Sequence, residues 1–219
     1  MELTITTIQF PEITLQTRDA HKLRGYFGNL FKEHSDLLHN HYADGTSKYQ
    51  YPLVQYKVIN KIPHLVGIEE GGELLIKLFF EMKNININGK NYSVYSRNIT
   101  KKITQLNDFN NLNEYKFETL YLPLNQKNHK RYINIENPQE KNIFLNKQIQ
   151  NNILSFYKGI KFFVEAQIMV KSKLYEKTTN FKSKQMLAFS GNFVTNSVLP
   201  DNIGIGKAVS RGFGTIIKF

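Results

Sequence analysis

The 219-residue sequence contains no cysteine, so it can form neither a disulfide framework nor a thiolate metal site. It has no apolar run long enough to cross a bilayer, and its first residues lack the basic start and apolar core of a signal peptide. With 41% hydrophobic residues, the chain can bury a real core in one large domain or two small ones. We therefore expect a globular, cytoplasmic protein.

Acidic residues are also scarce, because 18 Asp and Glu accompany 29 Lys and Arg, for a formal net charge of +11. Residues 111–219 hold most of the surplus, with 16 basic and 7 acidic side chains. Such a basic surface predicts a polyanionic partner whose binding weakens steeply with salt. The Lys, Asn and Ile richness of an AT-rich genome is the other explanation, and it accounts for scattered lysines better than for Arg211, one of only five arginines.

Two glycine-apolar-glycine triplets, at 204–206 and 212–214, enclose a short basic loop near the end of the sequence. Glycine allows positive φ and close approach to the main chain, and successive N–H groups in such a loop can form an anion-binding concavity. The spacing does not fit a P-loop or a dinucleotide fingerprint, since both require a following helix. A plain glycine-rich hairpin that closes a sheet is the alternative. The predicted phosphate-binding residues are Gly204, Gly206, Lys207, Ser210, Arg211, Gly212 and Gly214.

The first half of the chain has the order strand, helix, strand, strand, helix, strand, which is typical of a ferredoxin-like domain. Thr17 is the expected N-cap of the first helix, and the glycine pair at 71–72 is expected to precede the second. Asn88 and Gly89 predict a turn before the last strand. The strands are expected at residues 3–10, 52–59, 61–68 and 91–96, and the helices at 17–31 and 73–83.

The second half appears as a reduced copy of the same order, with strands expected at 115–121, 162–170 and 186–195 and a last strand after the glycine loop. Asn137 and Pro138 supply an N-cap and a first-turn proline for a long helix that Gly159 ends. The glycine loop replaces the second helix. We predict an α+β fold of tandem ferredoxin-like (RRM-like) domains, at residues 1–110 and 111–219.

The glycine loop resembles the C-terminal loop of CRISPR-associated endoribonucleases that cut repeat RNA into guide RNAs, a branch of the repeat-associated mysterious protein (RAMP) superfamily. Further segments in both halves resemble the same family in its order, namely residues 51–57, 124–128, 152–159 and 193–200. The resemblance implies metal-independent cleavage of CRISPR precursor RNA within its repeats, with 2′,3′-cyclic phosphate and 5′-hydroxyl products. It also implies a catalytic histidine after the first helix of the N-terminal domain.

His39 and His41 lie two residues apart in the expected loop after that helix, so on an extended backbone both imidazoles point to one side. Histidine can serve as base and acid near neutral pH, and the pattern does not decide which residue has which role. Lys48 is assigned charge stabilisation, and Tyr42 and Tyr49 lie close enough in sequence to complete the pocket.

Three other interpretations of this histidine pair stay open. The two imidazoles, with Asp36 or Asp44, form a pattern that can ligate a metal. Both histidines can be solvated loop residues, or one can be catalytic and the other structural.

Lys130 and Arg131 lie in an expected basic loop that either contacts RNA or is simply solvated.

No cofactor is expected from this sequence. The expected partner is CRISPR repeat RNA, and subunits of a CRISPR effector complex or a second copy of the chain are further candidates. The alternative function is a non-catalytic subunit that binds repeat or guide RNA within an effector complex.

Overall fold

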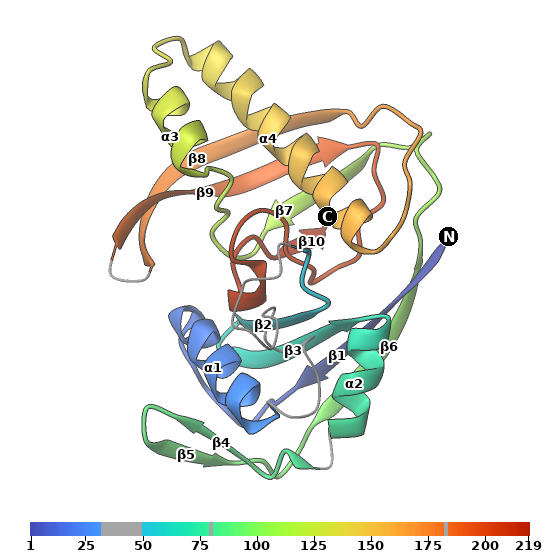
Figure 1. The fold of residues 1–219 in the computed structure, drawn as a ribbon, viewed down its shortest axis with the longest axis vertical. Helices are drawn as coiled ribbons and strands as arrows, with labels where there is room; N and C mark the ends of the chain where they lie inside the picture. The colour runs from blue at the N-terminus through green and yellow to red at the C-terminus, as the bar shows by residue number, and fades with distance from the viewer. Residues whose placement is uncertain (32–49, 79–80, 182–183) are drawn as a thin grey trace. The chain divides into compact units, whose positions relative to one another are not determined.

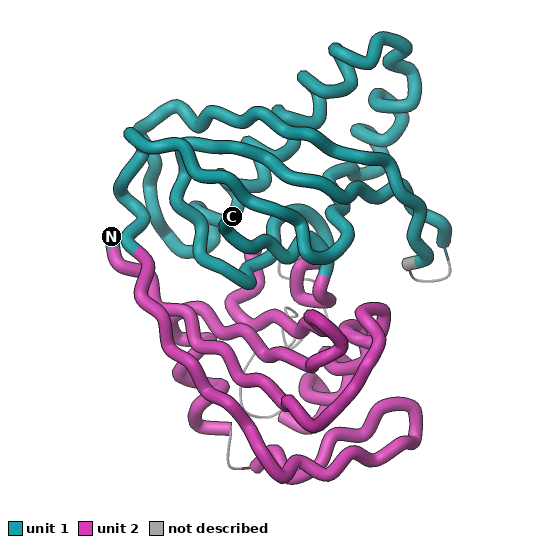
Figure 2. Tube along the Cα trace, turned by 180° about the vertical axis from the view of Figure 1, so that it is seen from behind, with its two compact units in different colours: residues 1, 105–208, 213–219 teal, residues 2–104, 209–212 magenta. Residues whose placement is uncertain are grey.

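The computed structural model describes residues 1–31, 50–78, 81–181 and 184–219. The chain forms two compact units, drawn in different colours in Figure 2. The N-terminal unit comprises residues 2–104 and 209–212, and the C-terminal unit comprises residues 1, 105–208 and 213–219. The N-terminal unit is therefore completed by a short segment from the other half of the sequence.

Helices and strands of both units are labelled in Figure 1. The N-terminal unit contains β1 (Glu2–Gln9), the 3₁₀ turn η1 (Thr17–Asp19), α1 (Ala20–Leu30), β2 (Val54–Ile59), β3 (Ile62–Ile68), α2 (Glu70–Leu78), β4 (Asn84–Ile87), β5 (Lys90–Ser93), β6 (Asn98–Gln105) and the 3₁₀ turn η4 (Val209–Arg211). The C-terminal unit contains β7 (Asn113–Phe117), α3 (Gln126–Ile133), α4 (Pro138–Gly159), β8 (Val170–Phe181), β9 (Lys184–Thr195) and β10 (Ile216–Lys218). Among these helices, none combines the length and the apolar character that a membrane span requires.

The sheet of the N-terminal unit has the strand order β2-β3-β1-β6, with α1 between β1 and β2 and α2 after β3. This is the ferredoxin-like order, so the predicted fold class is confirmed. The fourth strand is β6 rather than the predicted strand at 91–96. Asn88 and Gly89 form the expected turn with φ of 54° and 79°, but the hairpin that they close joins β4 to β5 in a separate two-stranded sheet.

The start of α2 differs from the prediction because Gly71 and Gly72 lie inside its first turn rather than before it. A Cβ at Gly72 would lie 2.6 Å from Oγ1 of Thr6 on β1, and one at Gly67 on β3 would lie 2.5 Å from Cα of Gly72. The absence of side chains therefore lets the helix approach the sheet closely. These glycines serve packing rather than helix termination.

Aromatic side chains form the centre of the N-terminal core. The ring of Phe27 on α1 stacks with the rings of Phe10, Phe31 and Tyr56, at centroid distances of 6.1, 6.2 and 6.1 Å. All four side chains are buried. This packing explains why α1 forms although it contains two glycines, which are unfavourable in a helix by about 1 kcal/mol each.

The C-terminal unit repeats the fold, because its sheet order β10-β7-β9-β8 matches the first sheet strand for strand. The long helix α4 connects β7 to β8. No α-helix occurs in residues 196–215, all of which the structure describes, so the loop between β9 and β10 replaces the second helix as predicted. The unit is a ferredoxin-like domain reduced by one helix.

The predicted strand at residues 162–170 is wrong, because β8 begins only at its last residue. The N–H of Phe162 donates instead to the carbonyl of Tyr157 at the end of α4 (2.9 Å). Nearer β8, the side chain of Asn196 accepts from the N–H of residue 169 (2.8 Å) and donates to the carbonyl of residue 167 (3.0 Å). The backbone of residues 162–169 thus forms hydrogen bonds with the end of α4 and with the Asn196 side chain. Although its apolar residues alternate, the segment does not pair with a neighbouring strand.

Helix α4 starts as the sequence predicts, with Asn137 as N-cap accepting from the N–H groups of residues 139 and 140 and proline in the first turn. Its side chains then cover β8, an edge strand of the sheet. Asn142 donates to the carbonyl of Ser172 (3.1 Å), Asn146 accepts from the Ser172 N–H (2.9 Å), and Gln150 donates to the carbonyl of Ile168 (3.0 Å). The amides of Asn142 and Asn146 satisfy backbone groups that the edge strand leaves open, and Gln150, four residues further on, binds the segment that precedes the strand.

Asn146→Ala is expected to lower the free energy of unfolding by about 1–3 kcal/mol, because Ser172 is buried and would lose the acceptor for both its N–H and its hydroxyl. Urea denaturation followed by circular dichroism measures the change. Asn151→Ala is the matched control, an exposed asparagine on the same helix, and should be neutral or slightly stabilising. Equal effects of the two substitutions would contradict a special role for the amide row.

Candidate nucleic-acid interface

The glycine loop is an ordered structure. Its two ends are hydrogen-bonded to each other and to the segment that follows β7. Gly204 pairs with Thr215 in an isolated bridge, and the N–H of Ile205 donates to the carbonyl of Gly214 (2.9 Å). The N–H of Gly214 donates to the carbonyl of residue 120 and that of Lys207 to the carbonyl of residue 122, both at 2.9 Å. These N–H groups are occupied, so the anion-binding concavity predicted from the glycines is not built from them.

Close packing explains three of the glycines. A Cβ at Gly206 would lie 2.7 Å from the ring of Tyr121, and a Cβ at Gly214 only 1.9 Å from the carbonyl oxygen of Ile205. Gly212 belongs to the N-terminal unit, where its Cβ would meet that of Ala20 at 2.7 Å. All three have positive φ, of 95°, 63° and 86° respectively. The glycines therefore fix the path of the loop and hence the position of its cations.

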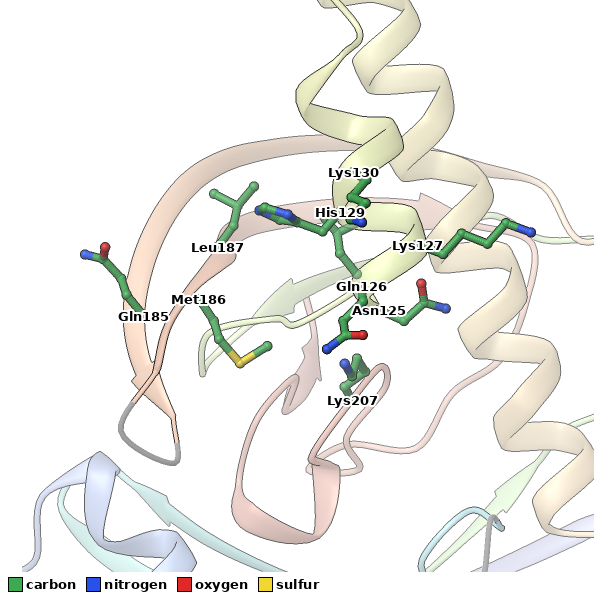
Figure 3. A pocket seen from close by; sticks show the side chains of 10 residues that line it. Asn125, Gln126, Lys127, His129, Lys130, Gln185, Met186, Leu187 and Lys207 are labelled. Atoms are coloured by element: carbon green, nitrogen blue, oxygen red, sulfur yellow. The ribbon is translucent and has the colours of Figure 1, made fainter.

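Lys207 faces a cavity of about 720 Å³ in the C-terminal unit (Figure 3). The cavity lies between α3, the beginning of β9 and the glycine loop, and Lys127, His129 and Lys130 reach it from α3. Three lysines and an imidazole thus line one hollow, with His129 pointing toward Leu187 and the side chain of Lys127 extending to the other side of α3 (Figure 3). Such a group can bind a phosphodiester backbone through charge-assisted hydrogen bonds.

Helix α3 was not predicted, since its basic residues were expected in a loop. Asn125 caps its start by accepting from the N–H of Asn128 (2.8 Å), whose side chain donates to Gln148 on α4 (2.8 Å). At its other end the hydroxyl of Tyr132 donates to Glu176 on β8 (2.7 Å). Burial, together with this carboxylate, raises the pKa of Tyr132. The helix is thereby held on both α4 and the sheet.

The structure places the residues predicted to contact RNA in different parts of the molecule. Lys207 and Lys130 line the same cavity, but Arg131, next to Lys130, places its guanidinium over the ring of Phe144, 5.5 Å from the centroid. Ser210 and Arg211 belong to the N-terminal unit, in the short turn η4. Lys127 was not among the residues predicted to contact RNA, although residues 124–128 form one of the segments that carry the family resemblance.

In the N-terminal unit, η4 contacts α1 and β2. Arg24 lies one turn after Ala20 on α1, and both Arg24 and Arg211 are half-buried. Burial lowers the pKa of Arg24, and the nearby charge of Arg211 lowers it further. Two positive charges therefore lie close together at a partly buried place of the N-terminal unit.

His39, His41, Tyr42, Lys48 and Tyr49, the predicted catalytic residues, lie outside the described residues. Their assignment rests on the sequence alone.

The protein is of the class with tandem ferredoxin-like domains, and its C-terminal domain carries the glycine loop and a basic cavity. Comparison with known proteins defines the family. Residues 1–105 match the family model of the Cas6b N-terminal domain, and residues 108–219 match that of the Cas6b C-terminal domain. The chain belongs to the Cas6b family.

Two solved structures and one further relative are similar to this chain. The chain shares 34% sequence identity with a crystal structure of Cas6b, with a TM-score of 0.95 and full coverage of both chains. A crystal structure of the CRISPR RNA processing endoribonuclease Cas6b is 30% identical, with a TM-score of 0.81 and full coverage of both chains. An uncharacterised protein of Methanocaldococcus jannaschii is 29% identical over 148 residues, which are 67% of this chain and 97% of that protein.

Proposed function

We propose that this protein is a metal-independent endoribonuclease that cuts CRISPR precursor RNA within its repeats. The observation that carries the proposal is that Lys207, from the glycine loop, lines one cavity with Lys127 and Lys130, in a chain 30% identical over its full length to a CRISPR RNA processing endoribonuclease. The basic charge of residues 111–219 supports a polyanionic substrate.

Cleavage without a metal requires a base that removes the proton of the 2′-hydroxyl and an acid that protonates the departing 5′-oxygen. We assign these roles to His39 and His41. Lys48 stabilises the charge of the phosphorane, and Tyr42 and Tyr49 complete the pocket. The 2′-oxygen forms a bond to phosphorus as the 5′-oxygen leaves, so the products carry a 2′,3′-cyclic phosphate and a 5′-hydroxyl.

The test uses purified protein and repeat RNA from its own genomic locus in excess EDTA. One cut per repeat, with a cyclic phosphate on the upstream product and none after a 2′-deoxy substitution at the scissile position, is the expected result. Cleavage that stops on chelation would replace the mechanism with a metal-dependent one. Tight binding without cleavage would instead make the protein a guide-RNA-binding subunit.

We assign RNA-backbone binding to Lys207, Lys127 and Lys130 in the C-terminal unit, and to Arg211 with Arg24 in the N-terminal unit. Ser210 and Arg131 are further candidates for contact with phosphate, while the glycines at 204, 206, 212 and 214 hold the loop in place. The charges at the cavity and the proximity of the two arginines support these assignments.

Lys207→Gln is expected to weaken repeat-RNA binding and to reduce the slope of log K against log salt by about one, because one phosphate contact is lost. Fluorescence anisotropy between low and physiological salt measures both quantities. Lys218→Gln, an exposed lysine on β10 outside the cavity, is the matched control. Identical slopes for the two variants would remove Lys207 from the interface.

A further inference from the structure

The cavity has walls that a phosphate backbone does not require. Tyr121 and Phe189 are joined in an isolated bridge, with N–H to carbonyl distances of 2.8 and 2.9 Å, and the cavity lies between the segments that follow Tyr121 and precede Phe189. Its apolar lining comes from Leu124, Met186 and Leu187. Its amide lining comes from Asn125, Gln126 and Gln185.

The edge of β9 adds backbone groups to this wall. In an antiparallel ladder the N–H and C=O of one residue point to the same side, and those of residues two apart point the same way. Since Phe189 uses both groups to bond Tyr121, the N–H and C=O of Leu187 point to that side too, away from β8. The paired register of β7 with β9 covers only residues 192–195 of β9. A donor and an acceptor of Leu187 therefore border the cavity.

The cations lie around these walls. Lys127, Lys130 and Lys207 line the cavity, and the side chain of His129 extends from α3 toward Leu187 (Figure 3). An imidazole can stack on a base, apolar side chains can contact its other face, and amides with a backbone edge can bind its hydrogen-bonding edge. The lysines can hold the phosphates on either side of that nucleotide.

We propose that this cavity holds one unpaired nucleobase of the bound RNA and contributes sequence specificity to its recognition. This inference rests on the proposed function for the identity of RNA as the ligand. The cavity volume of about 720 Å³ is ample for a nucleotide together with its adjacent phosphates. Amide, backbone and apolar groups in one place distinguish base recognition from the sequence-independent grip of lysines alone.

The test is an abasic scan of the repeat RNA. In wild-type protein, removal of the base at one position should weaken binding about 5- to 100-fold, the range expected for loss of one stacked base. In the pocket variant Gln185→Ala/Leu187→Ala, the same abasic RNA should bind no worse than the intact RNA. The matched control is Gln139→Ala/Leu154→Ala, which changes the same residue types at exposed positions of α4 outside the cavity and should keep the full abasic effect.

A second measurement requires no substitution. RNA that carries 4-thiouridine or 5-iodouridine at the position found by the scan should crosslink, in wild-type protein, to a peptide that contains residues 185–187 or His129. An abasic penalty that persists unchanged in the pocket variant, or crosslinks confined to other peptides, overturns the inference. Absence of any binding to single-stranded or repeat RNA overturns it as well.

Cleavage of the intact repeat RNA is measured in parallel, so that the two ideas can fail separately. A single cut in EDTA without a base in the cavity leaves the proposed function standing and removes the pocket. A base in the cavity without cleavage supports the pocket and replaces the endoribonuclease with a sequence-reading RNA-binding subunit.

Discussion

Simultaneous replacement of His39 and His41 by alanine is expected to abolish cleavage of repeat RNA while leaving its affinity close to the wild-type value. General acid and general base catalysis each contribute about 10²–10⁴-fold to the rate, so the double variant should lose at least about 10⁴-fold. RNA affinity should persist because we assign binding to the glycine loop and to α3. Single-turnover kinetics with enzyme in excess separates the chemical step from binding.

The two single variants should distinguish the acid from the base. A substrate in which sulfur replaces the departing 5′-oxygen has a better leaving group and needs less help from an acid. The variant that lacks the acid should therefore be rescued by this substrate, and the variant that lacks the base should not. His21→Ala, an exposed histidine on α1, is the control and should cleave at the wild-type rate. A double variant that still cleaves normally would make the pair ordinary loop residues.

The ferredoxin-like order was predictable because apolar residues recur in the sequence with the spacing typical of buried strands and amphipathic helices. The N-cap Asn137 and the turn at Gly89 are local signals, and both are found where they were expected. Two of the edge strands, β6 and β8, carry weaker signals. Strand β6 is almost wholly exposed, and β8 is rich in lysine, so pairing with a neighbour decides their structure rather than their own hydrophobic pattern.

The candidate site was predictable only in part, for a related reason. Lys207 and Lys130 were identified from local patterns in the sequence. They line one cavity because α3 and the glycine loop lie close together in the folded unit, and no local pattern predicts that proximity. The glycine spacing likewise did not show that Lys207 and Arg211 belong to different units. Gln185 and Leu187 are unremarkable in the sequence, and they matter only because β9 has an edge beside Phe189.

Gly214→Ala is expected to lower the free energy of unfolding by at least about 3 kcal/mol, since it combines an unfavourable φ with a backbone clash. The residue has φ of 63°, and the new Cβ would lie 1.9 Å from the carbonyl oxygen of Ile205. The N–H of Ile205 also donates to the carbonyl of Gly214, so the two residues are paired across the loop. Neither backbone can move without breaking the Ile205 to Gly214 hydrogen bond. For a chain of this length, the melting temperature should fall by roughly 6–12 °C.

Two glycines separate the contributions to this effect. Gly89→Ala meets nothing within 4 Å but has φ of 79°, so it should show only the conformational cost of about 1–3 kcal/mol. Gly25→Ala, in the open middle of α1, should stabilise the protein by up to about 1 kcal/mol. The order of stability Gly25→Ala, Gly89→Ala, Gly214→Ala would establish that the loop glycines serve its architecture. If Gly214→Ala instead left stability intact and weakened only RNA binding, the glycine itself would be part of the phosphate-binding surface, and the packing account of the loop would be wrong.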